Sequence, residues 1–289
     1  MRILVTGSAG FVGKELVRIL KKDNHFVIGL DIKEDNQSDI FFQHDLTTSF
    51  GEEIKFDLCI HLASSVGWIL FNTEKVDIIK YNNLINKYTL EILKKNGCNR
   101  MIFFSSINVF EWKNEFPHAK LTGLDQQSSY ALSKGMSEMF FSSWIENLIV
   151  IRPTNIFWKS QIKNHSKFGE SHVIPDLLIK ISTASEWIEV FGDGKQIRNF
   201  LHVEDIIEFL LLILSFEGQY YLNLRSDILI SIGMLAEELI QFSQKTLHID
   251  YLPEFMKYEQ MNIENFDIEI PRALWFAPRI DSIKYWLSI

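Results

Sequence analysis

A glycine-rich segment near the N-terminus constrains the fold of this chain more strongly than any other feature. The short apolar run of residues 2–6 leads into Gly7-Ser-Ala-Gly10-Phe-Val-Gly13, and residues 13–22 then carry apolar side chains at helical spacing. A second apolar run, residues 26–30, follows. A strand, a glycine loop, a helix and a second strand in this order predict a βαβ unit of a parallel sheet.

The three glycines have separate physical roles in such a loop. Gly7 allows the tight turn, Gly10 lets the backbone approach a pyrophosphate, and Gly13 permits close packing of helix on strand. The helix N-terminus offers unpaired N–H groups to an anion. A glycine turn without a ligand is the alternative, which the flanking strand and helix disfavour. The predicted cofactor contacts of this loop are Gly7, Ala9, Gly10, Phe11, Val12 and Gly13.

Asp31, eighteen residues beyond Gly13, ends the second apolar run. A carboxylate at this point can accept hydrogen bonds from the ribose hydroxyls of an adenosine and would repel a 2′-phosphate, so NAD is favoured over NADP. Lys33 would soften that preference, and Ile32 is predicted to lie beside the same ribose. The alternative for Asp31 is a solvated residue at the end of a strand.

Strand-like and helix-like segments alternate through the first 155 residues, and this rhythm breaks after Pro153. The fold class predicted is α/β, a Rossmann-like doubly wound parallel sheet with a smaller C-terminal substrate-binding lobe. Residues 1–155 together with about 197–226 are assigned to the NAD-binding domain. Residues from about 156–196 and 227–289 are assigned to the lobe.

Charge and composition exclude several classes of function. The chain has 29 basic and 37 acidic side chains, a net charge of −8 and no basic runs, so no nucleic-acid partner is expected. Its longest apolar stretch, residues 206–216, is shorter than the roughly 18 residues that cross a bilayer, so no membrane partner is expected either. Two cysteines and eight histidines show no metal-ligand spacing. We therefore expect a cytoplasmic protein without a metal.

Tyr130 and Lys134 lie four residues apart in a helix-like segment and therefore share one face of the helix. A neighbouring ammonium favours the phenolate, so Tyr130 could exchange a proton with a sugar or alcohol hydroxyl. An ordinary amphipathic helix is the alternative. Ser105 and Ser106 favour the catalytic interpretation, because they end a strand at the sheet edge where ligands bind in open α/β folds.

Together these residues resemble the extended short-chain dehydrogenase/reductase family, and within it the NAD-dependent epimerase/dehydratase branch that acts on nucleotide sugars. The resemblance covers almost the whole chain. Its motifs here are Thr6-Gly-Ser-Ala-Gly-Phe-Val-Gly13, Asp31, Asp45-Leu46, Ile60-His-Leu-Ala63, Phe104-Ser-Ser-Ile-Asn-Val-Phe110, Tyr130-Ala-Leu-Ser-Lys134, Arg152-Pro-Thr-Asn155 and residues 190–205.

The resemblance implies a role for each matching position. Ser106, Tyr130 and Lys134 match the catalytic residues: Ser106 hydrogen-bonds the reacting sugar oxygen, Tyr130 is the acid/base, and Lys134 binds the nicotinamide ribose. The remaining implied cofactor contacts are Asp45, Leu46, Leu62, Ala63, Ser64, Asn82, Ser105 and Pro153, with Asn83 as an alternative register for Asn82. The implied substrate contacts are Ser106, Asn108, Asn155, His172 and Arg198.

Departures from the family pattern narrow the chemistry. Dehydratase members carry Asp-Glu directly after the catalytic hydroxyl residue, whereas this chain has Ile107 and Asn108, and Ile107 cannot transfer a proton. A 4,6-dehydratase is therefore disfavoured. The segment around His172 resembles the part of GDP-fucose synthase whose histidine acts as an acid during epimerisation, which leaves open whether His172 is catalytic or only contacts substrate.

These observations favour an NAD-dependent enzyme that transfers a hydride at carbon 4 of a nucleotide-activated hexose, with a 4-epimerase preferred. The alternatives are an NAD(P)H-dependent 4-keto-6-deoxy-sugar reductase and, less favoured, a non-catalytic dinucleotide-sensing protein of the same fold. The resemblance also implies a homodimer. Met136, Met139, Phe140 and Phe141 are candidates for its interface, with burial in the chain's own core as the alternative.

Overall fold

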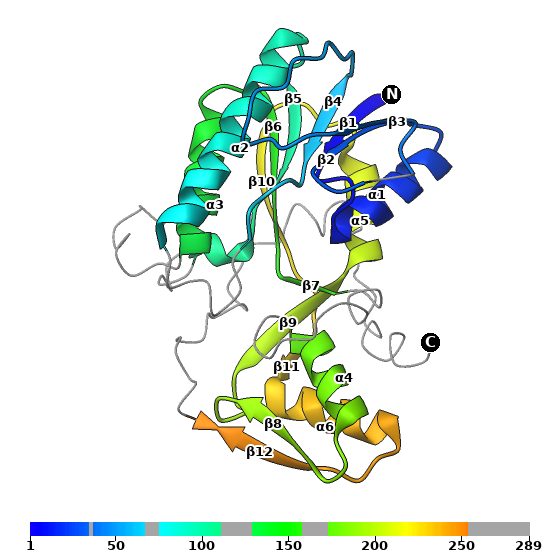
Figure 1. The fold of residues 1–289 in the computed structure, drawn as a ribbon, viewed down its shortest axis with the longest axis vertical. Helices are drawn as coiled ribbons and strands as arrows, with labels where there is room; N and C mark the ends of the chain where they lie inside the picture. Colours follow the sequence, from blue (N-terminus) through cyan, green and yellow to red (C-terminus); the bar gives the residue numbers. More distant parts are fainter. Residues whose placement is uncertain (35–36, 67–74, 111–128, 158–172, 254–289) are drawn as a thin grey trace.

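The computed structural model of this chain describes residues 1–34, 37–66, 75–110, 129–157 and 173–253 (Figure 1). A large parallel sheet with helices on both faces occupies one end of the molecule, and a smaller group of strands and helices occupies the other. Within the described ranges, no helix combines the length and the apolar character needed to span a membrane.

The large sheet has seven strands in the order β10-β6-β5-β4-β1-β2-β3, and every neighbouring pair is parallel. This confirms the predicted Rossmann-like sheet. The chain order reverses between β1 and β4, and such a switch point is where open α/β sheets bind their ligands. The strands are β1 (Arg2–Thr6), β2 (Phe26–Asp31), β3 (Ile40–Gln43), β4 (Leu58–His61), β5 (Arg100–Phe104), β6 (Asn147–Pro153) and β10 (Gln219–Leu224).

Two pairs of helices bury the two faces of this sheet. Helices α1 (Phe11–Lys22) and α5 (Val203–Ile213) pack on one face, while α2 (Lys75–Lys95) and α3 (Ser129–Ser142) pack on the other, as Figure 1 shows. In strand β1, successive side chains point to opposite faces of the sheet. Ile3 therefore belongs to the core under α1, and Leu4 belongs to the core under α2. Burial on both faces explains the nearly continuous apolar runs of these strands.

Among the described residues, the smaller end comprises two further sheets and two helices. The first sheet contains β7 (Asn155–Phe157), β9 (Ile197–His202) and β11 (Leu229–Ser231), and the second contains β8 (Trp187–Phe191) and β12 (His248–Leu252). Helices α4 (Val173–Thr183) and α6 (Ile232–Ser243) pack with these strands around a third apolar core. The division into an NAD-binding domain and a substrate-binding lobe stays a prediction.

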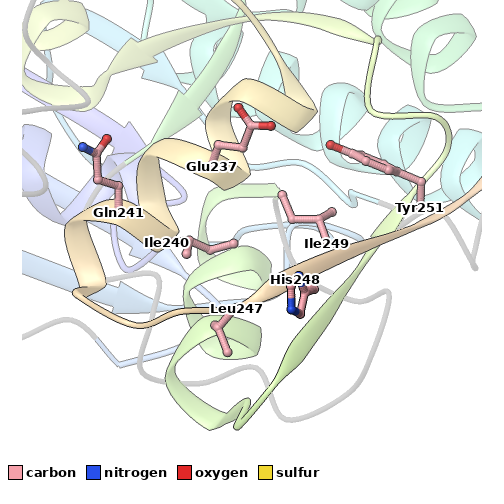
Figure 2. Close-up of a pocket in the computed structure, with 7 residues that line it drawn as sticks. All are labelled: Glu237, Ile240, Gln241, Leu247, His248, Ile249 and Tyr251. Carbon is pink, nitrogen blue, oxygen red and sulfur yellow. The ribbon is translucent and has the colours of Figure 1, made fainter.

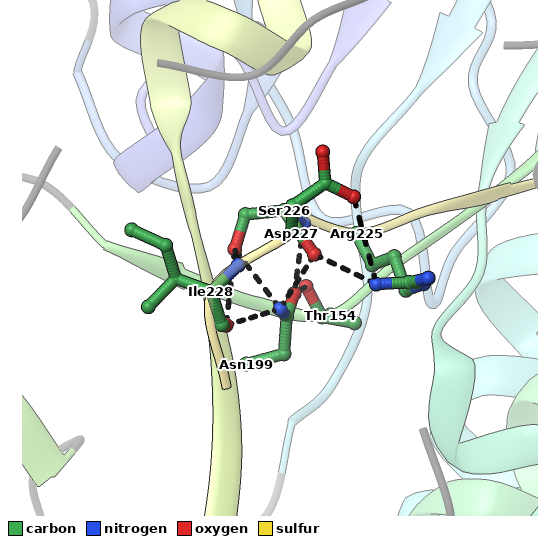
Figure 3. Close-up of polar contacts among 6 residues, drawn as sticks. All are labelled: Thr154, Asn199, Arg225, Ser226, Asp227 and Ile228. Atoms are coloured by element: carbon green, nitrogen blue, oxygen red, sulfur yellow. Dashed lines mark hydrogen bonds and ion pairs between the residues drawn. The ribbon is translucent and has the colours of Figure 1, made fainter. Parts of the chain in front are cut away.

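Asn199 in β9 joins the two ends of the molecule through a fully buried amide (Figure 3). Its Oδ1 accepts hydrogen bonds from Thr154 Oγ1 at 2.7 Å and from the backbone N–H of Ser226 at 2.9 Å. Its Nδ2 donates to the backbone oxygens of Ser226 and Ile228 at 2.9 and 2.7 Å. A buried amide with all its groups paired fixes geometry, so Asn199 holds β9 against the ends of β6 and β10.

Candidate functional site

The carboxyl edge of the parallel sheet gathers most of the residues predicted to bind cofactor. The glycine loop follows β1, Asp31 ends β2, and Ala63 lies two residues beyond β4. Ser105 follows β5 and Pro153 ends β6. Because β1, β2, β4, β5 and β6 are mutually parallel, these positions share one edge, as the sequence predicted.

The glycine loop has no room for side chains at the positions of its glycines. A Cβ at Gly13 would lie 2.0 Å from the backbone oxygen of Gly7, and a Cβ at Gly7, whose φ is +74°, would lie 2.8 Å from the backbone nitrogen of Ala63. Gly10 is the N-cap of α1 and provides no side-chain cap. The bare loop and uncapped helix start form a cradle that fits the pyrophosphate of a dinucleotide.

Asp31 is fixed against this loop by two backbone N–H groups. Its Oδ2 accepts a hydrogen bond from Ala9 at 3.0 Å and its Oδ1 accepts one from Lys33 at 2.8 Å. Each carboxylate oxygen keeps lone-pair capacity for another donor. The carboxylate is therefore oriented beside the glycine loop in a way that suits adenosine ribose hydroxyls. Ile32, beside it, is 60% exposed.

Asn82 connects the loop after β4 with the helix that carries Tyr130 and Lys134. Its side chain exchanges two hydrogen bonds with the backbone of Ser65, at 2.7 and 2.9 Å, and donates a third to Ser133 Oγ at 2.8 Å. Asn82 is 3% exposed, whereas Asn83 is exposed. The structure therefore turns Asn82, and not Asn83, toward the sheet edge.

The remaining cofactor candidates line the neighbouring loops. Leu46 is 4% exposed, while Asp45 is exposed and its Oδ1 accepts a hydrogen bond from the backbone N–H of Thr47 at 2.8 Å. Leu62 packs against the core under α1, and its backbone N–H donates to the oxygen of Thr6 at 3.1 Å. Ser64 Oγ donates to Asn82 Oδ1 at 3.2 Å.

Lys134 is buried on the inner face of α3, one turn after Tyr130. Its Nζ donates a hydrogen bond to the backbone oxygen of Phe104 at 2.9 Å and lies 5.9 Å from the centre of the Tyr130 ring. Burial lowers the pKa of Lys134 to about 8, an effect that Glu138 partly opposes. At neutral pH the side chain is therefore mainly an ammonium beside the tyrosine, which is the arrangement the predicted acid/base chemistry needs.

The two serines after β5 make different contacts. Ser106, 9% exposed, accepts a hydrogen bond on Oγ from the backbone N–H of Asn108 at 3.2 Å, and its own hydroxyl hydrogen has no acceptor among the described residues. Ser105 donates its hydroxyl hydrogen to Glu138 Oε1 at 2.5 Å. Ile107 is 3% exposed and begins a short 3₁₀ helix, so an apolar core residue stands directly after Ser106.

Arg198 is a half-buried cation without an acidic partner in the part of the chain that the structure describes. Its Nη1 donates to the backbone oxygen of Ile197 at 2.9 Å, and burial lowers its pKa. No carboxylate of the described ranges pairs with it. A desolvated guanidinium of this kind suits an anionic ligand. Asn155, on the adjacent strand β7, donates from Nδ2 to the backbone oxygen of Asn199 at 2.9 Å.

Several predicted or candidate features lie elsewhere. His172 lies outside the described residues. Phe141 is fully buried in the core under α2 and α3, so it is a core residue and not part of an exposed dimer surface. Met136 and Met139 are 36% and 55% exposed.

The hollow in Figure 2 lies between α6 and β12 and is lined by residues such as Glu237 and Tyr251. It includes none of the predicted site residues. The described residues contain no metal-ligand cluster.

Sequence reasoning missed two residues of this region, Glu138 and Asn199. Glu138 follows Lys134 by four residues, so helical spacing already places both side chains on one face of α3. Asn199 carried no such signal, because its partners Thr154 and Ser226 are 45 and 27 residues away in the chain.

Comparison with known proteins identifies the family. The model of the NAD dependent epimerase/dehydratase family matches residues 3–221. The chain belongs to this family. The family is NAD-dependent, which confirms NAD as the cofactor and an enzyme of the extended short-chain dehydrogenase/reductase type.

Proteins similar to this chain are named for several different reactions. GDP-mannose 3,5-epimerase 1 of Oryza sativa subsp. indica is 25% identical over 88% of this chain and 71% of its own length. Human dTDP-D-glucose 4,6-dehydratase is 26% identical over 85% of this chain and 75% of its own length. The crystal structure of UDP-glucose 4-epimerase from Thermotoga maritima, with UDP-glucose, has the same fold: the TM-score is 0.77 at 20% identity, covering 99% of this chain and 96% of that one.

Proposed function

We propose that this protein acts on a nucleotide-activated hexose by transferring a hydride at carbon 4, and that it is a 4-epimerase. The observation that carries the proposal is the contact between the ammonium of Lys134, which lies beside Tyr130, and the end of β5, two residues before Ser106. Tyr130 takes the proton from the carbon-4 hydroxyl and later returns one. Ser106 donates a hydrogen bond to the same sugar oxygen. Bound NAD supplies the acceptor and donor for the hydride.

Arg198 is proposed to bind the anionic diphosphate of the substrate. The side chain is half-buried and has no carboxylate partner in the described ranges, and its planar fork matches the oxygens of a phosphate. Asn155 lies on the strand that pairs with β9 and is a second candidate contact for the nucleotide diphosphate. A nucleoside diphosphate linked to a hexose supplies both the anion for Arg198 and a hydroxyl for Tyr130.

The residue after Ser106 argues against elimination of water. Ile107 is an apolar core residue, so this position has no group that can move a proton. Of the reactions at a single carbon, the epimerisation is favoured by the orientation of Asp31, which suits NAD that stays bound through oxidation and reduction. A 4-keto-6-deoxy-sugar reductase is the alternative.

A turnover assay separates the two reactions. The purified protein is first extracted and the extract analysed for NAD, and it is then incubated with UDP-, GDP-, dTDP- and CDP-hexoses. We expect retained NAD and formation of the 4-epimer of one sugar nucleotide without net change in absorbance at 340 nm. Consumption of added reduced cofactor in proportion to product would establish the reductase instead. Failure of all four nucleotides, with either cofactor, would contradict both.

We also propose a homodimer formed through α2 and α3. Met136 and Met139 leave apolar surface exposed on α3, and Tyr81 on α2 is 42% exposed. Light scattering during size-exclusion chromatography should give twice the chain mass of 33.8 kDa. Replacement of Met139 by Glu should give the monomer mass, and a wild-type monomer would contradict the proposal.

A further inference from the structure

A buried ion pair underlies the proposed catalytic residues. Arg152 in β6 donates hydrogen bonds to both carboxylate oxygens of Glu138 in α3, from Nε to Oε1 at 2.9 Å and from Nη2 to Oε2 at 2.6 Å. The side chains are 15% and 8% exposed, respectively. Breaking a buried pair by removing one partner is strongly destabilising, whereas replacing both partners by apolar residues of similar volume is often neutral or stabilising. Packing alone therefore does not require two charges here.

Glu138 interacts with two parts of the proposed site. Its Oε1 accepts the hydroxyl hydrogen of Ser105, the residue directly before Ser106. Along α3 it follows Lys134 by one turn, and its charge opposes the effect of burial on the pKa of Lys134. One carboxylate thus acts on the ammonium beside Tyr130 and on the backbone that carries Ser106.

We propose that Glu138 is a positioning residue of the active site, which holds the Ser105-Ser106 turn in place and supplies a negative charge one helical turn from Lys134, while Arg152 compensates that charge. This inference rests on the proposed function for its catalytic meaning, but the effect on Lys134 is a property of the protein itself. Cζ of Arg152 lies over the rings of Phe110 and Tyr221, at 4.7 and 4.9 Å from their centres, so two aromatic contacts help to hold the guanidinium in place.

Few other charged or titratable groups of the described ranges face Lys134. His61, from β4, is buried and its pKa is lowered to about 3, chiefly by burial and further by Lys134, so it is neutral at the pH of interest. Tyr130 lies on α3 itself, and the contact from β5 is the uncharged backbone oxygen of Phe104. Glu138 is therefore the nearby negative charge that favours the ammonium.

The test measures the titration of Lys134 directly. Full-length protein labelled with ¹³C-lysine is titrated by NMR through its Hε–Cε resonances, and the Lys134 signal is assigned by its loss in Lys134→Arg. We expect a wild-type midpoint near pH 8. Glu138→Gln should lower this midpoint by roughly one pH unit. The double variant Glu138→Gln, Arg152→Met removes both charges of the ion pair, so Arg152 is not left without its partner, and it should shift the midpoint in the same direction and remain folded if the single variant does not.

Ser137→Ala is the matched control. Ser137 neighbours Glu138 in α3, is 2% exposed and accepts a hydrogen bond from Asn86 at 2.7 Å, but it carries no charge. This variant should lose stability without moving the Lys134 midpoint. An unchanged midpoint in the Glu138 variants, or an equal shift in Ser137→Ala, would overturn the inference.

The activity profile completes the test. If the protein epimerises a sugar nucleotide, the alkaline limb of its kcat/KM profile should move to lower pH in the Glu138 variants by the same amount as the Lys134 midpoint. A moved midpoint with an unmoved alkaline limb would refute the catalytic role of Glu138. Absence of any wild-type turnover would refute the proposed function, and the NMR titration would still decide whether Glu138 controls Lys134.

Discussion

Lys134 on helix α3 donates a hydrogen bond to the backbone oxygen of Phe104, the last residue of strand β5. This contact fixes the helix that carries Tyr130 to the strand end that carries Ser106, although the two segments are separated by some thirty residues of sequence. The proposed proton-transfer residues and the proposed substrate-binding serine are thereby linked by one hydrogen bond from a side chain to the backbone.

Replacing Tyr130 by Phe removes only the phenolic oxygen. Because that oxygen is the proposed acid/base, we expect kcat to fall by about 10³-fold or more while the Kd for NAD changes little. Steady-state kinetics and calorimetric titration with NAD measure the two effects. Undiminished turnover would refute the role of Tyr130, and loss of NAD binding would show that the variant has damaged the cofactor site instead.

Gly13→Ala should disrupt the cofactor loop, because the added Cβ would lie 2.0 Å from the backbone oxygen of Gly7. We expect a loss of about 1–3 kcal/mol in the free energy of unfolding and a large loss of NAD affinity. Gly51→Ala is the control, since a Cβ there meets nothing within 4 Å. Urea unfolding and NAD titration compare the two variants. Equal behaviour would contradict the close packing described for the loop.

Lys134→Met should stabilise the protein at neutral pH. The folded pKa of Lys134, about 8, lies below its usual 10.5, so burial of the ammonium costs stability below pH 8. That cost corresponds to about 3 kcal/mol, partly offset by the lost hydrogen bond to Phe104, so we expect a gain of about 2 kcal/mol at pH 7.

The sign of the pH dependence provides the check. Between pH 8 and 10.5 the unfolded chain binds more protons at this site than the folded chain, so the wild type gains stability as the pH rises and the advantage of Lys134→Met shrinks. Urea unfolding at pH 7 and pH 10 measures this. Lys87→Met, at a 56% exposed lysine, should change stability by less than about 0.5 kcal/mol. A destabilised Lys134→Met protein at pH 7 would contradict the prediction.

Arg198→Gln should weaken substrate binding without destabilising the fold. The guanidinium has no acidic partner in the described ranges, so its removal breaks no ion pair there, whereas a charge-assisted contact with phosphate contributes about 1.5–3 kcal/mol. We expect KM to rise by about 10- to 100-fold at an unchanged Kd for NAD. Arg100→Gln is the control: Arg100 begins β5, at the opposite edge of the sheet, and its loss should leave KM unchanged. An unchanged KM in Arg198→Gln would remove Arg198 from the site.

The sequence was sufficient for the parts of the site that local pattern determines. Apolar periodicity and the glycine spacing predicted the βαβ unit, and the place of Asp31 at a strand end predicted its position beside the loop. Helical spacing likewise predicted that Tyr130 and Lys134 share a face of α3.

Contacts between distant segments could not be read in this way. The partners of Glu138, namely Ser105 and Arg152, come from two strands, and no periodicity relates them to the helix. Phe141 shows the same limit: its apolar character suited both an exposed dimer surface and the core, and only the packing of α3 on the sheet places it inside.

The most direct test of the central claim follows the hydrogen on carbon 4. A sugar nucleotide identified as a substrate is synthesised with deuterium at this carbon and converted by the wild-type protein, and the product is analysed by NMR. Because the proposed reaction removes and returns that hydrogen within one active site, the product should be the 4-epimer with deuterium still at carbon 4, and turnover should be slower than with the unlabelled sugar. Retention of deuterium with inversion only at another carbon, accompanied by uptake of solvent hydrogen there, would contradict the account.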